Sequence, residues 1–144
     1  MTPSTDDWLR RIRPASNATH RLVCFPHAGG SASFFRWIFQ MLPTTTEVLG
    51  VQYPGRQDRR SEPLIPTISG LADQVHEVLG SRLDRPTAFF GHSMGAVVAF
   101  EVARRLTASG PGRRGGPGHG GAPAVLFVSG CQAPPGGRRA PTLR

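Results

Sequence analysis

Short, nearly continuous apolar runs recur along the chain, and segments with helical spacing separate them. A short uninterrupted apolar run is typical of a strand that is covered on both faces. The sequence predicts strands of this kind at residues 21–26, 48–53, 87–90 and 124–128. Helices are expected between them, at residues 31–42, 67–83 and 94–106.

Helical periodicity is clearest in the segment 67–83, where apolar residues recur three or four positions apart and would line one face of a helix. These residues are Ile68, Leu71, Ala72, Val75, Val78 and Leu79. For the segment before it, Ser31 or Ser33 could cap a helix that runs to about Leu42.

The alternation of strands and helices predicts the fold class. A strand followed by a helix and another strand pairs in parallel through a right-handed crossover, which places helices on both faces of the sheet. We therefore expect an α/β fold with a doubly wound, mostly parallel sheet at residues 20–130. Residues 1–19 are polar and interrupted by proline, so they are expected to form an irregular lead-in, and residues 131–144 an irregular tail rich in Arg, Gly and Pro.

Basic residues are unevenly distributed along the chain. The formal net charge is +8, yet residues 1–101 carry 10 Arg and 9 acidic residues, whereas residues 102–144 carry 7 Arg and no acid. An Arg/Gly segment of this kind can be an arm that binds nucleic acid or an acidic partner. No aromatic stacking platform is interleaved with these arginines. We therefore interpret the segment as the product of a GC-rich coding sequence, which could also be read out of frame near its end. We expect no nucleic-acid partner.

Cysteine and histidine usage excludes several classes of protein. The two cysteines, Cys24 and Cys131, provide no disulfide framework and fit a reducing compartment. No pair of Cys or His has the spacing of zinc ligands, so no metal site is expected. No apolar run approaches the length of a membrane span, and the N-terminus lacks the apolar region of a signal peptide. We expect a cytoplasmic protein that does not associate with membranes.

The first motif with chemical meaning is Gly91-His92-Ser93-Met94-Gly95, which matches G-x-S-x-G between an expected strand and an expected helix. In that context a serine is held on a strained turn at the carboxyl edge of the sheet, where it can act as a nucleophile. The helix N-terminus favours developing negative charge there. A structural serine is the alternative, but the buried strand before the motif and the Ala- and Val-rich helix after it favour the nucleophile.

The second motif is FPHAGG at residues 25–30, which ends the first expected strand. Acyl transfer requires two backbone N–H donors for the oxyanion, one from the residue after the nucleophile and one from a loop after an earlier strand. Met94 and Ala28 are the candidates for these donors. The alternative is an ordinary glycine turn that caps a helix. We favour the oxyanion hole because the turn and the serine would lie at the same edge of the sheet.

Three blocks of the sequence, LVCFPHAGGSASFF, VLGVQYPGRQDR and FFGHSMGAVVAFEVARRL, resemble the type II thioesterases of polyketide and nonribosomal peptide synthesis. The resemblance extends from about Trp8 to Gly130 and includes the spacing of the blocks. It implies an α/β-hydrolase that removes stalled or aberrant acyl groups from the phosphopantetheine arm of an acyl carrier or peptidyl carrier protein. It further implies a monomer without a cofactor of its own, with Ser93 as nucleophile and Ala28 and Met94 in the oxyanion hole.

The sequence departs from that family after Ser93. The hydrolase triad runs Ser, acid, His along the chain, but the only later carboxylate, Glu101, would lie about 12 Å further along the helix axis. The only later histidine is His119, in a Gly/Arg linker. We therefore expect a partial fold, truncated after the fourth strand, in which the lid and the triad acid and base are absent. Activity should fall by several orders of magnitude relative to an intact triad.

Two histidines lie near the expected nucleophile. His92 adjoins Ser93, but adjacent side chains on such a turn diverge, whereas His27 could contact substrate or act as a substitute base. Other functions stay open at this point. The chain could be a generic esterase or a product-releasing thioesterase domain, because the motif does not encode the acyl group. It could be a non-catalytic module that binds acidic carrier proteins through arginines. It could also be a pseudogene or sequencing-error product without a stable fold.

Overall fold

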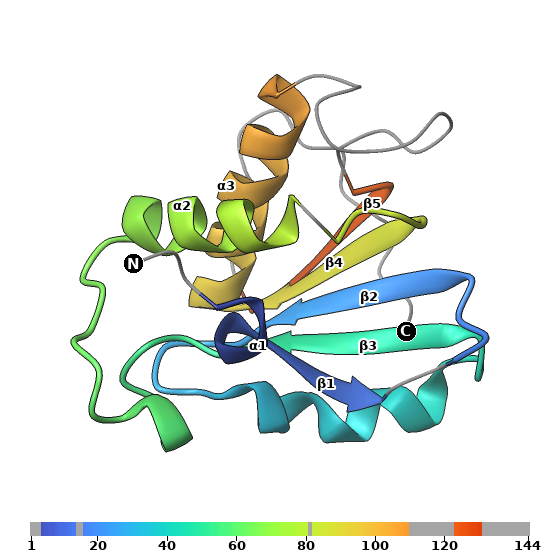
Figure 1. Cartoon of the computed structure of the whole chain (residues 1–144), viewed down its shortest axis with the longest axis horizontal. Helices are drawn as coiled ribbons and strands as arrows, with labels where there is room; N and C mark the ends of the chain where they lie inside the picture. Colours follow the sequence, from blue (N-terminus) through green and yellow to red (C-terminus); the bar gives the residue numbers. More distant parts are fainter. Residues whose placement is uncertain (1–3, 14–15, 81, 110–122, 131–144) are drawn as a thin grey trace.

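The computed structural model describes residues 4–13, 16–80, 82–109 and 123–130. These residues form a five-stranded sheet with the strand order β1-β3-β2-β4-β5. The strands are β1 (Leu9–Arg13), β2 (His20–Phe25), β3 (Thr46–Val51), β4 (Thr87–His92) and β5 (Val125–Ser129). The helices are α1 (Thr5–Trp8), α2 (Ile68–Leu79) and α3 (Met94–Ala108), with the 3₁₀ helices η1 (Ala32–Met41) and η2 (Gln57–Arg59). Figure 1 shows α2 and α3 on one face of the sheet and η1 on the other.

Parallel pairing of the central strands brings several loops to one edge of the sheet. β2 pairs in parallel with β3 and β4, and β5 pairs in parallel with β4. Phe25 lies opposite Gly91, and His92 lies opposite Ser129. The ends of β2, β4 and β5 therefore meet at the carboxyl edge of the sheet, which is where ligand sites form in open α/β sheets. The mostly parallel sheet with helices on both faces confirms the expected fold class.

The expectation of an irregular lead-in at residues 1–19 is wrong for residues 5–13. There α1 leads into β1, which pairs antiparallel with β3 at the edge of the sheet. Trp8 and Leu9 are buried, and the Arg13 guanidinium donates hydrogen bonds to backbone carbonyl oxygens in and after η1. Three of the five residues of β1 are arginines, so the strand shows no apolar run. Their aliphatic stems nevertheless pack while their charged heads reach polar partners.

The other expected elements are present with shifted ends. The segment expected as a helix over 31–42 is the 3₁₀ helix η1, whose consecutive aromatic residues are poor formers of a regular α-helix. The Thr67 hydroxyl accepts a hydrogen bond of 3.0 Å from the Gly70 N–H, so α2 begins after Thr67. The tail at 131–144 and most of the Gly/Arg linker lie outside the described residues.

Two apolar clusters fix the layers of the fold. The larger lies between the sheet and helices α2 and α3 and includes Phe25, Phe89 and Val98. The smaller lies between the sheet and η1 and includes Cys24 and Phe35. Both clusters use residues of β2, which is the middle strand of the sheet, so the end of β2 is held from both faces. In the described part of the chain, no helix is long and apolar enough to cross a membrane.

Candidate active site

Ser93 lies between the end of β4 and the first residue of α3, on a turn that few residues adopt. Its φ of 54° and ψ of −120° are sterically costly for a residue with a side chain. Its backbone N–H donates a hydrogen bond of 2.8 Å to the carbonyl oxygen of Ser129, at the end of β5. The side chain is half-buried, and its hydroxyl has no hydrogen-bond partner among the described residues. The turn therefore presents an unengaged hydroxyl at the carboxyl edge of the sheet.

Two glycines allow the strand and the helix to meet at this turn. A Cβ added at Gly91 would lie 2.5 Å from the Cα of Ala96, and a Cβ added at Gly95 would overlap the carbonyl group of Phe25. Side-chain carbons do not approach backbone atoms so closely, and only glycine fits at either position. Gly95 thus packs the first turn of α3 directly against the end of β2.

The turn after β2 lies beside this serine turn. It carries the FPHAGG residues 25–30, with Gly29 at a φ of 77° and a hydrogen bond of 3.0 Å from the Gly30 N–H to the His27 carbonyl oxygen. The imidazole rings of His27 and His92 lie 5.8 Å apart between centroids, so the two motifs are in contact. Ala28 is exposed in this turn, and Met94 is the first residue of α3. Their assignment as oxyanion donors stays a prediction.

Two residues directly after β3 make hydrogen bonds to the backbone at the two ends of the glycine turn. The buried Tyr53 hydroxyl donates a hydrogen bond of 3.2 Å to the Pro26 carbonyl oxygen. The Gln52 side-chain oxygen accepts a hydrogen bond of 2.9 Å from the Ala32 N–H, where η1 begins. Burial raises the pKa of Tyr53, which keeps the phenol protonated and able to donate. Sequence reasoning missed these anchors, although their position between a strand and Pro54 marks them as residues at the functional edge of the sheet.

An aromatic cluster adjoins the serine turn and contains His27, His92 and Phe34. The His27 and Phe34 rings lie 4.9 Å apart, and the Phe34 and His92 rings lie 6.0 Å apart. The His27 Nδ1 is buried and has no hydrogen-bond partner among the described residues. The His92 Nδ1 lies 3.3 Å from the Ser129 hydroxyl oxygen. The Nδ1 side of the His92 ring is therefore directed toward β5, whereas the buried Nδ1 of His27 has no such partner.

Two arginines of α3 engage the carboxylate of Glu101. The Arg104 and Arg105 guanidinium groups donate hydrogen bonds of 2.9 and 2.8 Å to its carboxylate. Those bonds, the one from Arg104 foremost, keep the pKa of Glu101 below its usual value. His119 lies outside the described residues. Within the described ranges, no carboxylate–histidine pair is hydrogen-bonded to Ser93, and no cluster of three or more His, Cys, Asp or Glu could hold a metal ion.

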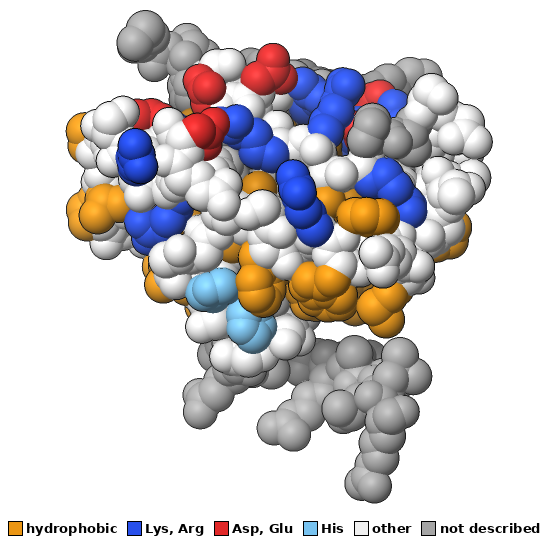
Figure 2. All heavy atoms as spheres, turned by 90° about the horizontal axis from the view of Figure 1, so that it is seen from below, with side chains coloured by type: hydrophobic (Ala, Val, Ile, Leu, Met, Phe, Trp, Pro, Cys, Tyr) orange, Lys and Arg blue, Asp and Glu red, His pale blue; other side chains and the backbone are white. Residues whose placement is uncertain are grey.

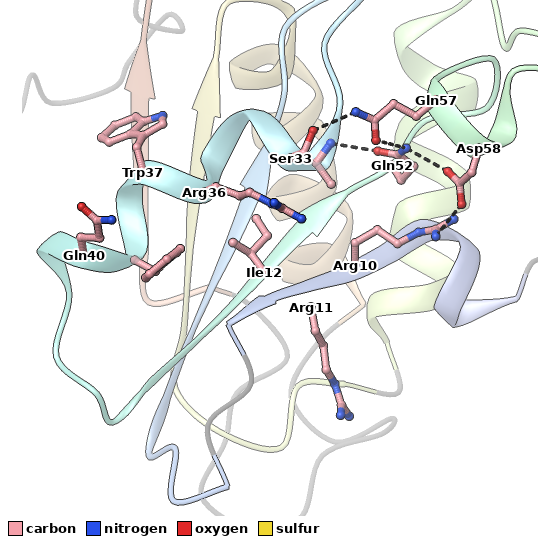
Figure 3. Close-up of a pocket in the computed structure, with 12 residues that line it drawn as sticks. Arg10, Arg11, Ile12, Ser33, Arg36, Trp37, Gln40, Gln52, Gln57 and Asp58 are labelled. Carbon is pink, nitrogen blue, oxygen red and sulfur yellow. Dashed lines mark hydrogen bonds and ion pairs between the residues drawn. The ribbon is translucent and has the colours of Figure 1, made fainter.

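A cavity of about 620 Å³ opens elsewhere, between β1 and η1, and Ser93 does not line it. Figure 3 shows polar side chains from β1, η1 and the segment after β3 converging there. This cavity and the serine turn are separate features that η1 connects. Phe34 of η1 belongs to the histidine cluster, while its neighbour Ser33 lines the cavity.

A serine on a strained strand-to-helix turn, beside a glycine turn at the carboxyl edge of a parallel sheet, defines the α/β-hydrolase class. Within that class the chain belongs to the thioesterase domain family, whose model, described as Thioesterase domain, matches residues 20–144.

Individual relatives support the same family. The Streptomyces griseus protein named "Probable cadicidin biosynthesis thioesterase" is 55% identical over 107 residues, which cover 74% of this chain and 30% of that protein. Thioesterase PikA5 of Streptomyces venezuelae is 48% identical over 130 residues, covering 88% of this chain and 42% of PikA5. Among solved structures, the type II thioesterase BorB from the borrelidin biosynthetic cluster superimposes with a TM-score of 0.72 at 43% identity, covering 88% of this chain and 47% of BorB. The chain thus spans less than half the length of these relatives.

Proposed function

We propose that the chain is the nucleophile-bearing part of a type II thioesterase, which hydrolyses acyl thioesters on the phosphopantetheine arm of acyl or peptidyl carrier proteins in polyketide or nonribosomal peptide synthesis. The observation that carries the proposal is the strained backbone of Ser93, whose φ of 54° is maintained beside a glycine turn. Strain of this kind persists where surrounding contacts enforce it, and it clusters at active sites. The similarity to PikA5 and BorB supports the thioester as substrate class.

The geometry supports the following reaction. The Ser93 Oγ attacks the thioester carbonyl carbon while a base takes its proton, and the backbone N–H groups of Ala28 and Met94 stabilise the oxyanion. The C–S bond then breaks, the phosphopantetheine thiol leaves with a proton, and water hydrolyses the acyl-serine to the free acid. His27 is the candidate base, because it lies in the neighbouring glycine turn and its Nδ1 has no hydrogen-bond partner among the described residues. Without an acid to orient it, this base should support acylation far more slowly than an intact triad.

Acylation of Ser93 tests the proposal directly. The 144-residue chain would be incubated with an acyl-pantetheine thioester, and intact-protein and peptide mass spectrometry would follow the acyl adduct. We expect an adduct on the peptide that carries Ser93 and none in Ser93→Ala. Ser129→Ala is the matched control, because it removes a neighbouring hydroxyl and leaves the backbone bond to Ser93 in place. Acylation that persists in Ser93→Ala, or an adduct found elsewhere, would contradict the proposal.

The leaving group separates a thioesterase from a generic esterase. The same acyl group presented as an oxygen ester of pantetheine should acylate Ser93 more slowly if the site is adapted to thioesters. Equal rates with both leaving groups, after correction for their intrinsic reactivity, would favour the generic esterase.

Three further properties belong to this proposal. The protein is cytoplasmic, because its carrier-bound substrates are intracellular. It is a monomer, which sedimentation equilibrium would test. It needs no metal or organic cofactor, since a hydroxyl, a base and two backbone amides supply the chemistry, and acylation in the presence of a chelator would test that statement.

A further inference from the structure

The cavity between β1 and η1 has an excess of positive charge. Three arginines line it, Arg10, Arg11 and Arg36, against the single acid Asp58. Figure 3 shows Arg36 extending from η1 toward the hydrogen-bonded side chains around Gln52, while Arg10 reaches Asp58 from β1. The proposed mechanism uses none of these arginines.

Asp58 offsets only the charge of Arg10, because one of its oxygens pairs with that arginine and the other accepts a hydrogen bond from Gln52. The Arg10 Nη1 lies 2.7 Å from one carboxylate oxygen, and the Gln52 amide donates a hydrogen bond of 3.1 Å to the other. The bond from Gln52, followed by that from Arg10, keeps the pKa of Asp58 below its usual value. Arg36 is exposed and has no hydrogen bond or ion pair with any described residue. Its charge is therefore available to a partner.

An apolar stripe adjoins Arg36 on the outer side of η1. Phe34, Trp37 and Met41 are 43%, 49% and 75% exposed, although large apolar side chains usually lie inside. Figure 2, which views the molecule from the η1 side, shows apolar side chains beside arginines and next to a pair of histidines. Trp and Arg side chains are enriched in protein interfaces.

The stripe begins at the candidate active site and leads away from it. Phe34 contacts both His27 and His92. From Phe34 to Met41, η1 extends about 14 Å at the rise of a 3₁₀ helix. A protein docked along η1 would therefore stand beside Ser93 and could deliver a flexible arm to it.

We propose that the outer face of η1, formed by Phe34, Arg36, Trp37 and Met41 together with Arg10 of β1, is the docking surface for the acidic carrier protein that presents the acyl thioester. The inference rests on the proposed function and adds the location of the partner. Charge complementarity selects this occupant. A second copy of the chain in a two-fold dimer would bring Arg36 close to its own equivalent. The segment 102–144 carries seven Arg and no acid, so it does not complement the face either.

A charge reversal with a matched control tests the docking surface. The probe is a fluorescently labelled acyl carrier protein in its phosphopantetheinylated form, titrated with the 144-residue chain at low ionic strength and followed by anisotropy. Arg36→Glu should weaken binding about tenfold, because it replaces attraction by repulsion. Arg104→Glu makes the same change in net charge on α3, across the sheet from η1, and should leave the affinity within about twofold.

Two further measurements sharpen the test. Trp37→Ala, which removes an exposed side chain, should weaken binding by a similar factor while circular dichroism stays unchanged. Raising the ionic strength from about 0.01 to about 0.15 M shortens the Debye length from about 30 to about 8 Å and should reduce the difference between Arg36→Glu and the unmodified chain. Equal effects of Arg36→Glu and Arg104→Glu, or no binding by the unmodified chain at low salt, would overturn the inference.

Failure of the docking surface is distinguishable from failure of the proposed function. A carrier-free acyl-pantetheine thioester needs no docking, so Arg36→Glu should acylate on Ser93 at the rate of the unmodified chain. Normal acylation without Arg36-dependent carrier binding overturns the docking surface alone. Carrier binding without any acylation of Ser93 overturns the proposed function alone. A DNA oligonucleotide that competes for this face with the same dependence on Arg36 would overturn the carrier as its occupant.

Discussion

Replacing Tyr53 with phenylalanine removes one buried hydroxyl and leaves the ring in place. Tyr53 is 2% exposed, and its hydroxyl donates to the carbonyl oxygen of Pro26, which is also buried. In Tyr53→Phe this carbonyl loses its donor at a site that water reaches poorly. An unsatisfied buried acceptor costs about 1–3 kcal/mol. Because the bond is long at 3.2 Å, we expect the lower part of that range, about 1–1.5 kcal/mol.

Thermal unfolding followed by circular dichroism measures this cost. For a chain of this size, 1 kcal/mol corresponds to about 4 °C in Tm, so Tyr53→Phe should melt about 4–6 °C below the unmodified chain. Thr107→Val is the matched control. It deletes a hydroxyl that donates to a backbone carbonyl at an exposed position of α3, where water replaces the bond, and should change stability by less than about 0.5 kcal/mol.

The same variant tests the role of the turn. If Tyr53 positions the turn that carries Ala28, the rate of Ser93 acylation should fall about three- to tenfold at a temperature where the variant is fully folded. A Tm equal to that of the unmodified chain would refute the assignment of the hydrogen bond. A lower Tm with an unchanged acylation rate would show that the bond stabilises the fold without positioning the proposed oxyanion donor.

Three other substitutions or labelling experiments have defined outcomes. Gly95→Ala should lower the free energy of unfolding by more than about 2 kcal/mol in urea denaturation and abolish acylation, because the added Cβ overlaps a carbonyl group of β2. As its control, Gly80→Ala meets only ordinary contacts at 3.5 Å and should be neutral or slightly stabilising. Glu47→Gln should destabilise the chain by about 2–3 kcal/mol, because the buried Arg21 guanidinium loses the carboxylate that lies 2.8 Å from it in the unmodified chain. A change below about 0.5 kcal/mol in urea denaturation would contradict this prediction. Burial raises the pKa of the Cys24 thiol to about 12, so iodoacetamide at pH 8 should leave it unlabelled in the native chain and label it in urea, as peptide mass spectrometry would show; native labelling would mean that β2 is accessible.

The central part of the fold could be predicted from the sequence because local pattern and tertiary burial agree there. The apolar run of β2 is covered on both faces, and the run of β4 leads into the Ser93 turn, so strand type and order follow from the residues alone. β1 could not be predicted in this way. It is an edge strand of arginines whose pairing with β3 depends on Trp8 and on backbone acceptors near η1, which are distant in sequence.

In the candidate site, too, only the features with a local sequence pattern could be predicted. Local sequence motifs predict the strained turn at Ser93 and the neighbouring glycine turn, and the parallel pairing of β2 with β4 places the two turns together. The bond from Tyr53 to Pro26 links residues 27 positions apart and has no local signature. The available charge of Arg36 likewise depends on the engagement of Asp58 by Arg10 and Gln52, which only the folded arrangement shows.

Ser93, the proposed nucleophile, is held in place by several contacts among the described residues. The Ser93 N–H donates a hydrogen bond to β5, and Gly95 packs on the end of β2. The Tyr53 hydroxyl donates a hydrogen bond to the start of the turn that carries Ala28. In the proposed reaction, attack and oxyanion stabilisation need this arrangement, whereas efficient proton transfer also needs a base that a carboxylate orients. Acylation should therefore respond to an added base only where this arrangement is intact. Imidazole in the buffer should accelerate acylation of Ser93 by an acyl-pantetheine in a concentration-dependent manner, and it should do nothing for Gly95→Ala, in which the geometry itself is lost. Equal acceleration of both chains would mean that imidazole attacks the thioester directly and that the arrangement around Ser93 contributes nothing to the reaction.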